Sequence, residues 1–210
     1  MRDAQGGEFP LSRAWNERPM LLALVFTRCA GVCSPFLSSL NAAETTVGGS
    51  GTDYGTVVLS FDPRDTPEDM ARLADRLGLQ ARPGWTFGVA SGPGVERLAG
   101  AVGFWFQRDE VTGQFDHPAL LVAVDRGRVV RLMVGGAVEP PRLFEVVREL
   151  RGEFVAAYPL PGRVLFRCFQ YDPRSGRFAL GWGFLLLALP AAVTLLGTAV
   201  LFVAARRGRS

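Results

Sequence analysis

Two cysteines and the only histidine of the chain carry its most distinctive chemistry. Cys29 and Cys33 lie in the segment FTRCAGVCSP at residues 26–35, and His117 lies far downstream. A helix that begins near Cys29 would place the two thiols one turn apart on one face. Thiolates at that separation can form a disulfide or bind a soft metal ion, and an imidazole can supply a third ligand. This set of ligands suits cuprous copper.

The same residues also have structural interpretations. Buried cysteines often behave as small core side chains, and a lone histidine is often structural. The third cysteine, Cys168, could be a further copper or redox contact, or simply a free thiol next to the apolar C-terminal segment. The residue types and spacing leave these alternatives open.

A group of acids follows the second apolar run of the chain. Asp62, Asp65 and Glu68 could be taken for a metal-binding cluster. A turn and a helix start explain them more simply, because Thr66 can cap a helix and Pro67 suits its first position. We therefore assign the three acids to a turn and to the first turn of a helix.

Strands and helices are predicted to alternate around the cysteine motif. Apolar runs predict strands at residues 20–26, 57–61, 85–90, 119–124 and 129–134. Capped or amphipathic segments predict helices at residues 29–40, 66–78, 94–102 and 141–157. The glycine-, threonine- and serine-rich residues 41–56 predict a loop. This pattern predicts an α/β fold with a mixed sheet flanked by helices, and a cysteine motif between a strand and its helix is typical of a thioredoxin-like arrangement.

The C-terminal part of the chain has the composition of a membrane anchor. Residues 179–205 contain no charged side chain. This uncharged run is longer than the roughly 20 residues that are needed to cross a bilayer. A buried core helix is the alternative, and the length of the run argues against it. The basic tail at residues 206–210 would stay in the cytoplasm, so the large N-terminal part would lie on the extracytoplasmic side.

The charge pattern gives no indication of nucleic-acid binding. The net charge is only +3, and the 23 basic residues are all arginine. These arginines are interspersed with acids and form no basic stripe. We therefore expect no nucleic-acid partner.

The first residues of the chain conflict with an extracytoplasmic location. Residues 1–18 are polar and contain no apolar segment typical of a signal peptide. We expect this lead to be poorly ordered. An extracytoplasmic domain would then need an upstream start or another route of export.

Three motifs resemble those of the Sco/SenC family. They are TxCxGVCxP at residues 27–35, SFDPxDTPE at residues 60–68 and Asp116–His117, in that order. The family consists of thioredoxin-like, membrane-anchored copper carriers that help to assemble the binuclear copper centre of cytochrome c oxidase. The resemblance implies copper as the bound ion, Cys29, Cys33 and His117 as its ligands, and an oxidase subunit as the copper acceptor.

The resemblance also implies a division of the chain and a competing function. We expect a copper-binding domain at residues 19–158, a juxtamembrane linker at 159–178 and a transmembrane helix at 179–205, as in a bacterial branch of the family with a C-terminal span. The competing function is that of a thiol–disulfide oxidoreductase that keeps the copper-ligand cysteines of the oxidase reduced. Both functions use Cys29 and Cys33, and only copper binding needs His117.

Overall fold

The computed structural model describes residues 1–153, 169–172, 177–180, 189–190, 193–195 and 197–198. The chain divides into two compact units, Met1–Glu153 and Phe154–Ser210. The first unit contains the motifs discussed above. The second unit contributes one described pair of antiparallel strands, β9 (Phe169–Asp172) and β10 (Arg177–Leu180).

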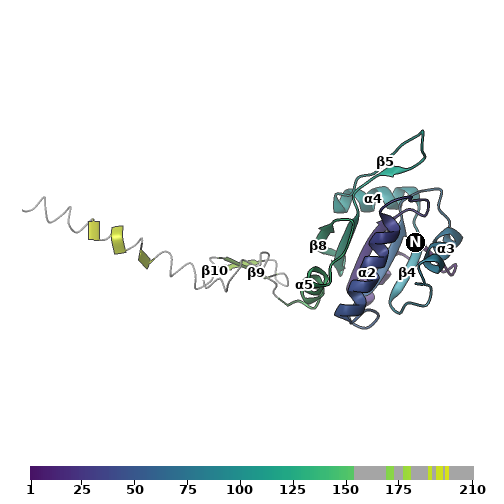
Figure 1. Ribbon diagram of the computed structural model, residues 1–210. Coiled ribbons are helices and arrows are strands. Elements are labelled where there is room, and N and C mark those ends of the chain that lie inside the picture. Colours follow the sequence, from purple (N-terminus) through teal and green to yellow (C-terminus); the bar gives the residue numbers. More distant parts are fainter. Residues whose placement is uncertain (154–168, 173–176, 181–188, 191–192, 196, 199–210) are drawn as a thin grey trace, which may run out of the picture. The chain divides into compact units, whose positions relative to one another are not determined.

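A six-stranded mixed sheet forms the centre of the first unit (Figure 1). Its order is β1-β4-β3-β2-β7-β8, in which β2, β3 and β4 are parallel and the other three strands are antiparallel to their neighbours. The strands are β1 (Arg2–Asp3), β2 (Met20–Val25), β3 (Gly55–Ser60), β4 (Trp85–Val89), β7 (Leu120–Asp125) and β8 (Arg128–Val134). The predicted mixed sheet is therefore present.

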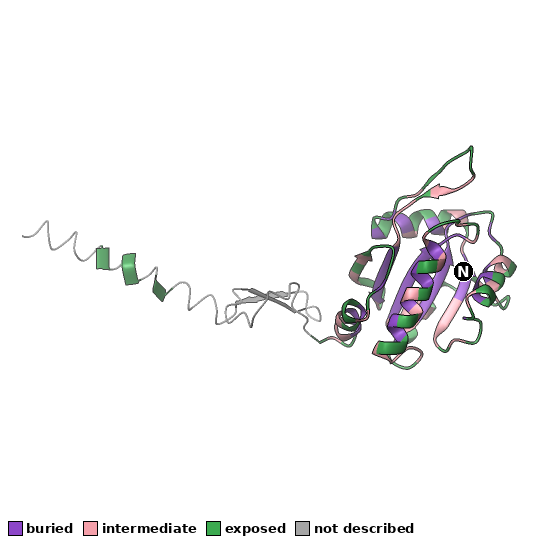
Figure 2. Cartoon of the chain, viewed as in Figure 1, coloured by how far each residue is buried: buried purple, intermediate pink, exposed green. Residues whose placement is uncertain are grey.

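Five helices accompany the sheet within Met1–Glu153. They are α1 (Leu11–Glu17), α2 (Cys33–Val47), α3 (Pro67–Arg76), α4 (Gly92–Val102) and α5 (Pro140–Leu150). Helix α2 crosses one face of the sheet with α5 packed beside it, α3 packs against β4, and α1 packs against β7 (Figure 1). All six residues of β2 are buried, so the central strands are covered on both faces (Figure 2). The architecture is the predicted thioredoxin-like one.

Helix α2 differs from its prediction at both ends. It begins at Cys33 rather than near Cys29, and it continues to Val47 through residues that were predicted to be a loop. The continuation depends on Glu44, a fully buried acid that accepts hydrogen bonds from Thr56 Oγ1 and, at 2.7 Å, from Trp85 Nε1. These partners come from β3 and β4. Because the helix buries an acid here, and the partners of that acid are distant in the sequence, residues 41–47 lack the hydrophobic pattern by which a helix is predicted.

The N-terminal segment also differs from its prediction. Residues 1–18 were expected to be poorly ordered, but Arg2 and Asp3 pair with β4 as an edge strand, and α1 follows. Trp15 in α1 packs against the core. Edge pairing depends mainly on backbone hydrogen bonds, which a polar sequence can supply as well as an apolar one.

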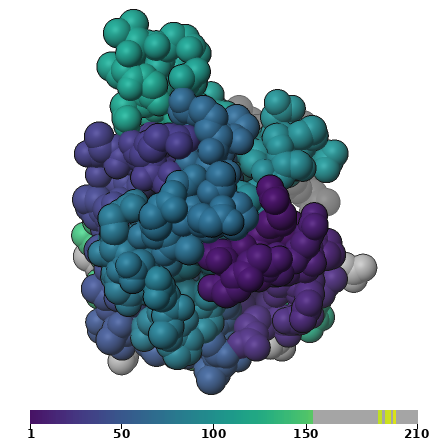
Figure 3. Space-filling view, turned by 90° about the vertical axis from the view of Figure 1, so that its right-hand side faces the viewer, coloured from purple at the N-terminus to yellow at the C-terminus, as the bar shows by residue number. Residues whose placement is uncertain are grey.

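A short hairpin projects from the end of the sheet where β2 leads into the cysteine motif. It consists of β5 (Gln107–Arg108) and β6 (Phe115–Asp116), and it stands out from the body of the domain (Figure 1). The space-filling view shows it as the teal projection at the top (Figure 3). The sequence analysis assigned no strand to these residues, because a two-residue strand is too short for a periodic pattern.

The predicted membrane span falls largely outside the described residues. Ala179 and Leu180, its first two residues, belong to strand β10 rather than to a helix. No helix within the described part of the chain has both the length and the apolar character to cross a membrane. The basic tail and most of the linker also lie outside that part.

Candidate metal centre

The two cysteines lie at the junction between β2 and α2. Cys33 is the first residue of α2 and is 3% exposed, whereas Cys29 lies in the preceding loop and is half-buried. The backbone N–H of Cys33 donates a hydrogen bond to Cys29 Sγ at 3.4 Å. Both thiols are free. The helix therefore starts one turn later than predicted, yet its first N–H group still donates to the Cys29 sulfur.

His117 lies beside the cysteines although it is 84 positions from Cys33 in the sequence. It follows β6, and its Nε2 lies 4.0 Å from Cys33 Sγ. Its Nδ1 lies 3.0 Å from the carbonyl oxygen of Pro118, to which it can donate a hydrogen bond. That tautomer leaves the Nε2 lone pair directed at the thiols, as a metal ligand requires. The orienting acceptor is thus a backbone carbonyl and not the neighbouring Asp116.

The three candidate ligand atoms form a compact group. One sulfur from each cysteine and a ring nitrogen of His117 all lie within 4.8 Å of one another. Three ligands in a plane with metal–ligand bonds of about 2.0–2.3 Å would be about 3.8 Å apart. Shortening the longest of these separations by about 1 Å would therefore suffice for a trigonal site. Two thiolates and an imidazole are the soft ligands that copper(I) accepts, so the residues fit this ion.

An aromatic cluster surrounds the imidazole. The His117 ring centroid is 5.6 Å from that of Phe26, 5.0 Å from Phe61 and 6.1 Å from Phe104, and the first two contacts are edge-to-face. Phe106 and Phe115 of the hairpin region pack in turn on Phe61. The cluster limits the rotation of the imidazole and excludes water from one side. Five rings spread over 90 positions give no local signal of a shared site, so the sequence did not indicate that these phenylalanines surround the candidate ligand.

The thiols differ in their protonation. The pKa of Cys29 is lowered to about 4, mainly by a hydrogen bond from the Cys33 thiol and to a smaller extent by one from His117. Partial burial opposes this change. The pKa of Cys33 is raised, because it donates that hydrogen bond and is buried. Burial lowers the pKa of His117, but its hydrogen bonds with Cys29 and the Pro118 carbonyl outweigh burial and raise it. The metal-free site is therefore a Cys29 thiolate beside a protonated Cys33. The Cys33 thiol, and the His117 ring when it carries a proton on both nitrogens and donates to Cys29, must each release a proton before they bind a metal.

The acids after β3 support the cysteine loop. Asp65 accepts hydrogen bonds from Thr27 N at 2.8 Å, Thr27 Oγ1 at 2.6 Å and Ser60 Oγ at 2.6 Å. Asp62 is paired with Arg28 and Arg64, and their hydrogen bonds outweigh burial and lower its pKa to about 2. Each carboxylate thus has several donors within the domain.

These contacts confirm the structural interpretation of the acidic segment. Thr66 caps α3 in a reciprocal pair with Asp69, and Glu68 lies in the first turn of that helix. Among the residues that the structure describes, the group formed by Cys29, Cys33 and His117 is the one with the spacing of a metal site. Cys168 lies outside the described residues.

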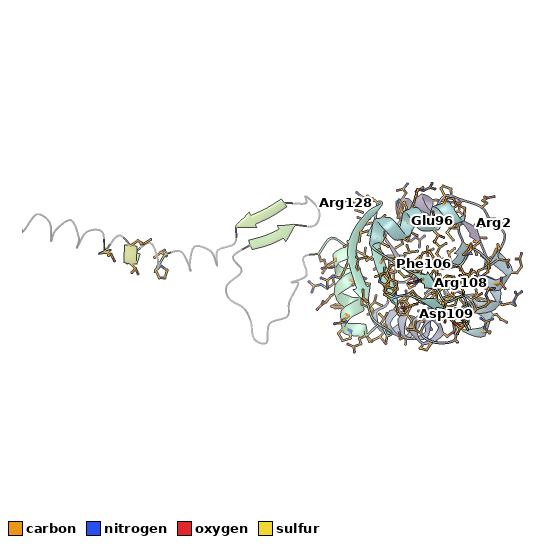
Figure 4. The ribbon with its side chains drawn as sticks, turned by 90° about the horizontal axis from the view of Figure 1, so that it is seen from above. Arg2, Glu96, Phe106, Arg108, Asp109 and Arg128 are labelled. Carbon is orange, nitrogen blue, oxygen red and sulfur yellow. The ribbon has the colours of Figure 1, made fainter. Side chains whose placement is uncertain are left out.

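Gln114 is a residue of the site that the sequence did not indicate. Its side-chain amide contacts the backbone on both sides of Cys29, accepting a hydrogen bond from Ala30 N and donating one to Arg28 O, each at 3.1 Å. A glutamine in a polar turn has no distinguishing pattern, so no feature of the sequence could have identified it. The hairpin that carries it lies over the middle of the domain, with Phe106, Arg108 and Asp109 labelled in the view from above (Figure 4).

Comparison with solved structures shows the same fold in several proteins. A protein from Aquifex aeolicus VF5 is 25% identical, with a TM-score of 0.67, over 75% of this chain and 92% of its own. ScoI of Arabidopsis thaliana with copper bound is 22% identical, with a TM-score of 0.60, over 71% of this chain and 93% of its own. BsSco, described with a disulfide switch, is 18% identical, with a TM-score of 0.57, over 71% of this chain and 87% of its own. At the identities of these two Sco proteins the likeness shows the fold alone.

Comparison with curated proteins gives no match. The family description SCO1/SenC matches residues 3–151, which include both cysteines, the acidic segment, the hairpin and His117. The match covers most of the chain and nearly all of the first unit. The chain therefore belongs to the SCO1/SenC family.

Proposed function

We propose that this chain is a copper carrier that binds copper(I) through Cys29, Cys33 and His117 and delivers it during assembly of cytochrome c oxidase. The convergence of two sulfurs and a ring nitrogen within 4.8 Å is the observation that carries this proposal. The family supports it, since ScoI of Arabidopsis thaliana is described with copper bound and BsSco is described as a member of the Sco family of cytochrome c oxidase assembly proteins.

The different exposure of the ligands suggests how copper would enter and leave. The half-buried Cys29, already a thiolate, is the ligand that an incoming donor or acceptor can reach first. Cys33 and His117 would complete the coordination from inside the domain, with loss of the Cys33 proton. Transfer would then proceed by stepwise exchange of ligands, in which Cys29 is also the first ligand to be replaced by a thiolate of the acceptor.

The location of the domain is part of the same proposal. We propose that residues 179–205 anchor the chain in a membrane and that the copper-binding domain faces the extracytoplasmic side. The uncharged run and the arginine-rich tail that follows it support this arrangement. An oxidising exterior would make copper loading depend on keeping the two cysteines reduced.

A thiol–disulfide oxidoreductase is the second candidate function. The observation in its favour is the pair of adjacent free thiols with opposite pKa changes. The Cys29 thiolate would attack a disulfide of the partner and release one partner thiolate. The Cys33 thiol would then lose its proton and attack the mixed disulfide, so that a Cys29–Cys33 disulfide forms and the partner receives both electrons.

Replacement of His117 distinguishes the two functions. We expect His117→Ala to lower copper(I) affinity by more than the 10- to 100-fold typical of losing an outer-shell partner, because a direct ligand is removed. Disulfide exchange needs no imidazole ligand and should continue. Competition with a chromophoric copper(I) chelator measures the affinity, and reduction of a small disulfide measures exchange.

Two further variants complete this experiment. Cys33→Ser should impair both activities, and His117→Asn tests whether any loss in the alanine variant reflects only the space left among the phenylalanines. Unchanged copper affinity in both His117 variants would refute the proposed copper site.

A further inference from the structure

We propose that Gln114 is a positioning residue that fixes the loop of Cys29 to the hairpin of His117. The inference deepens the proposed function, because it concerns how the same copper site is assembled. It begins with the unequal support of the three ligands. Cys33 is held by α2, and His117 is held by aromatic packing and the Pro118 carbonyl. Cys29 lies in a loop, where its own N–H makes only a 3.4 Å hydrogen bond to the carbonyl oxygen of Phe26.

The Gln114 side chain supplies the missing support. The peptide groups that flank Cys29 present an acceptor, Arg28 O, and a donor, Ala30 N. A side-chain amide is the group that can satisfy both at once, because it carries a donor and an acceptor in one plane. The two 3.1 Å contacts span 86 and 84 positions of sequence. The amide thus pairs with the cysteine loop as a neighbouring strand would.

The hairpin gives Gln114 a fixed base. Asp109 N donates to Gln114 O at 2.8 Å, and the Asp109 side chain accepts from Val111 N at 2.8 Å and closes the turn. Phe115, the next residue, packs edge-to-face on Phe26 and Phe61. We call the two hydrogen bonds from the Gln114 side chain to Arg28 O and Ala30 N the Gln114 clamp. The same short segment therefore carries this clamp and, three positions later, the His117 ligand.

The clamp contributes more to position than to stability. Both of its hydrogen bonds lie in an exposed part of the domain, where water competes for the same groups, so their net contribution to folding is small. A metal site loses function when its ligands are displaced by a fraction of an ångström. Loss of the clamp should therefore weaken copper binding by allowing Cys29 to move away from Cys33 and His117.

Two variants of Gln114 test the clamp in the full chain. Gln114→Met keeps the size of the side chain and removes both hydrogen bonds. It should lower copper(I) affinity about tenfold, as the loss of other outer-shell partners does. Gln114→Glu keeps the acceptor for Ala30 N and loses the donor to Arg28 O, so it should cause a smaller loss. Gln107→Met is the matched control, because Gln107 is an exposed glutamine of β5 in the same hairpin. It should leave the affinity unchanged.

A double-mutant comparison separates positioning from general destabilisation. In a Cys29→Ser background, measured with a weaker chelator, Gln114→Met should have no further effect, because the positioned ligand is already missing. Thermal unfolding should be nearly the same for the Gln114 and Gln107 variants. The inference would be overturned if Gln114→Met lowered copper(I) affinity by the same factor with and without Cys29. It would also be overturned if the Gln114→Met and Gln107→Met variants had equal affinities.

A measurement without copper keeps this test independent of the proposed function. The Ala30 amide should exchange its hydrogen about two- to tenfold faster in the Gln114→Met variant than in the wild-type chain or the Gln107→Met control, because its acceptor is removed. Unchanged exchange would refute the clamp. Faster exchange in a chain whose wild type binds no copper(I) would refute the proposed function and leave the clamp in place.

Discussion

Cys29 and Cys33 have identical side chains and opposite surroundings. Cys29 is half-buried and accepts hydrogen bonds, whereas Cys33 is 3% exposed and donates one. The spacing of the cysteines predicted their proximity, and the structure agrees. Their division into an accessible thiolate and a buried thiol depends on which of them begins α2, and this depends on tertiary packing that the motif does not describe.

The low pKa of Cys29 predicts an unusual pH dependence of its reactivity. Because a thiolate is the nucleophile, alkylation of reduced metal-free protein by iodoacetamide should be nearly independent of pH between 6 and 8, with a midpoint near pH 4. An ordinary cysteine, with a pKa of about 8.5, would react about tenfold faster per pH unit in that range. Mass spectrometry locates the label, which should be on Cys29 and not on Cys33.

Two Cys33 variants test the cause of this effect. Cys33→Ala removes the hydrogen bond that most lowers the Cys29 pKa, so the midpoint should rise. Cys33→Ser retains a donor and should keep the midpoint low. A tenfold increase per pH unit in the wild-type chain would contradict the assigned thiolate.

At the scale of elements, one carboxylate joins the end of β3 to the cysteine loop. Asp65, whose side chain is fully buried, connects Thr27, the first residue of the cysteine motif, with Ser60 at the end of β3. We expect Asp65→Ala to lower the free energy of unfolding by about 3 kcal/mol, because three neutral donors and the Arg28 guanidinium, 3.0 Å away, lose a charged acceptor. Chemical denaturation measures the change. Asp75→Ala, at an exposed position of α3, is the control and should change stability by less than about 0.5 kcal/mol. Equal stability of the two variants would show that Asp65 is dispensable.

The elements also show how far sequence reasoning extends. The buried strands and the capped helix α3 were predictable, because β2, β3 and β7 are continuous apolar runs and Thr66, Pro67 and Asp69 are local signals. The second half of α2 was not, since it depends on a buried acid paired with β3 and β4. The β5–β6 hairpin was missed because its strands are only two residues long, and the Gln114 contacts were missed because their partners are distant in the sequence. Local sequence patterns predict local structure, whereas the second half of α2 and the Gln114 contacts depend on partners that are distant in the sequence.

At the scale of the whole molecule, the metal centre belongs to one unit. Cys29, Cys33 and His117, the aromatic cluster and the supporting acids all lie within Met1–Glu153. A fragment of residues 1–153 should therefore fold and bind copper(I) with the affinity of the full chain, as measured by chelator competition. A much weaker fragment would show that the second unit contributes to the site.

The same fragment tests the proposed anchor. The full chain should sediment with phospholipid vesicles, because residues 179–205 are uncharged and long enough to span the bilayer. The fragment should remain in the supernatant. Equal partitioning of the two proteins would contradict a C-terminal anchor.

X-ray absorption at the copper K-edge of the copper(I)-loaded chain tests the central claim most directly. The arrangement of the three side chains predicts a three-coordinate ion with two sulfur neighbours and one nitrogen neighbour. Replacement of His117 should remove the nitrogen and leave the sulfurs. A first shell of two sulfurs alone in the wild-type chain, or one without sulfur, would contradict the account.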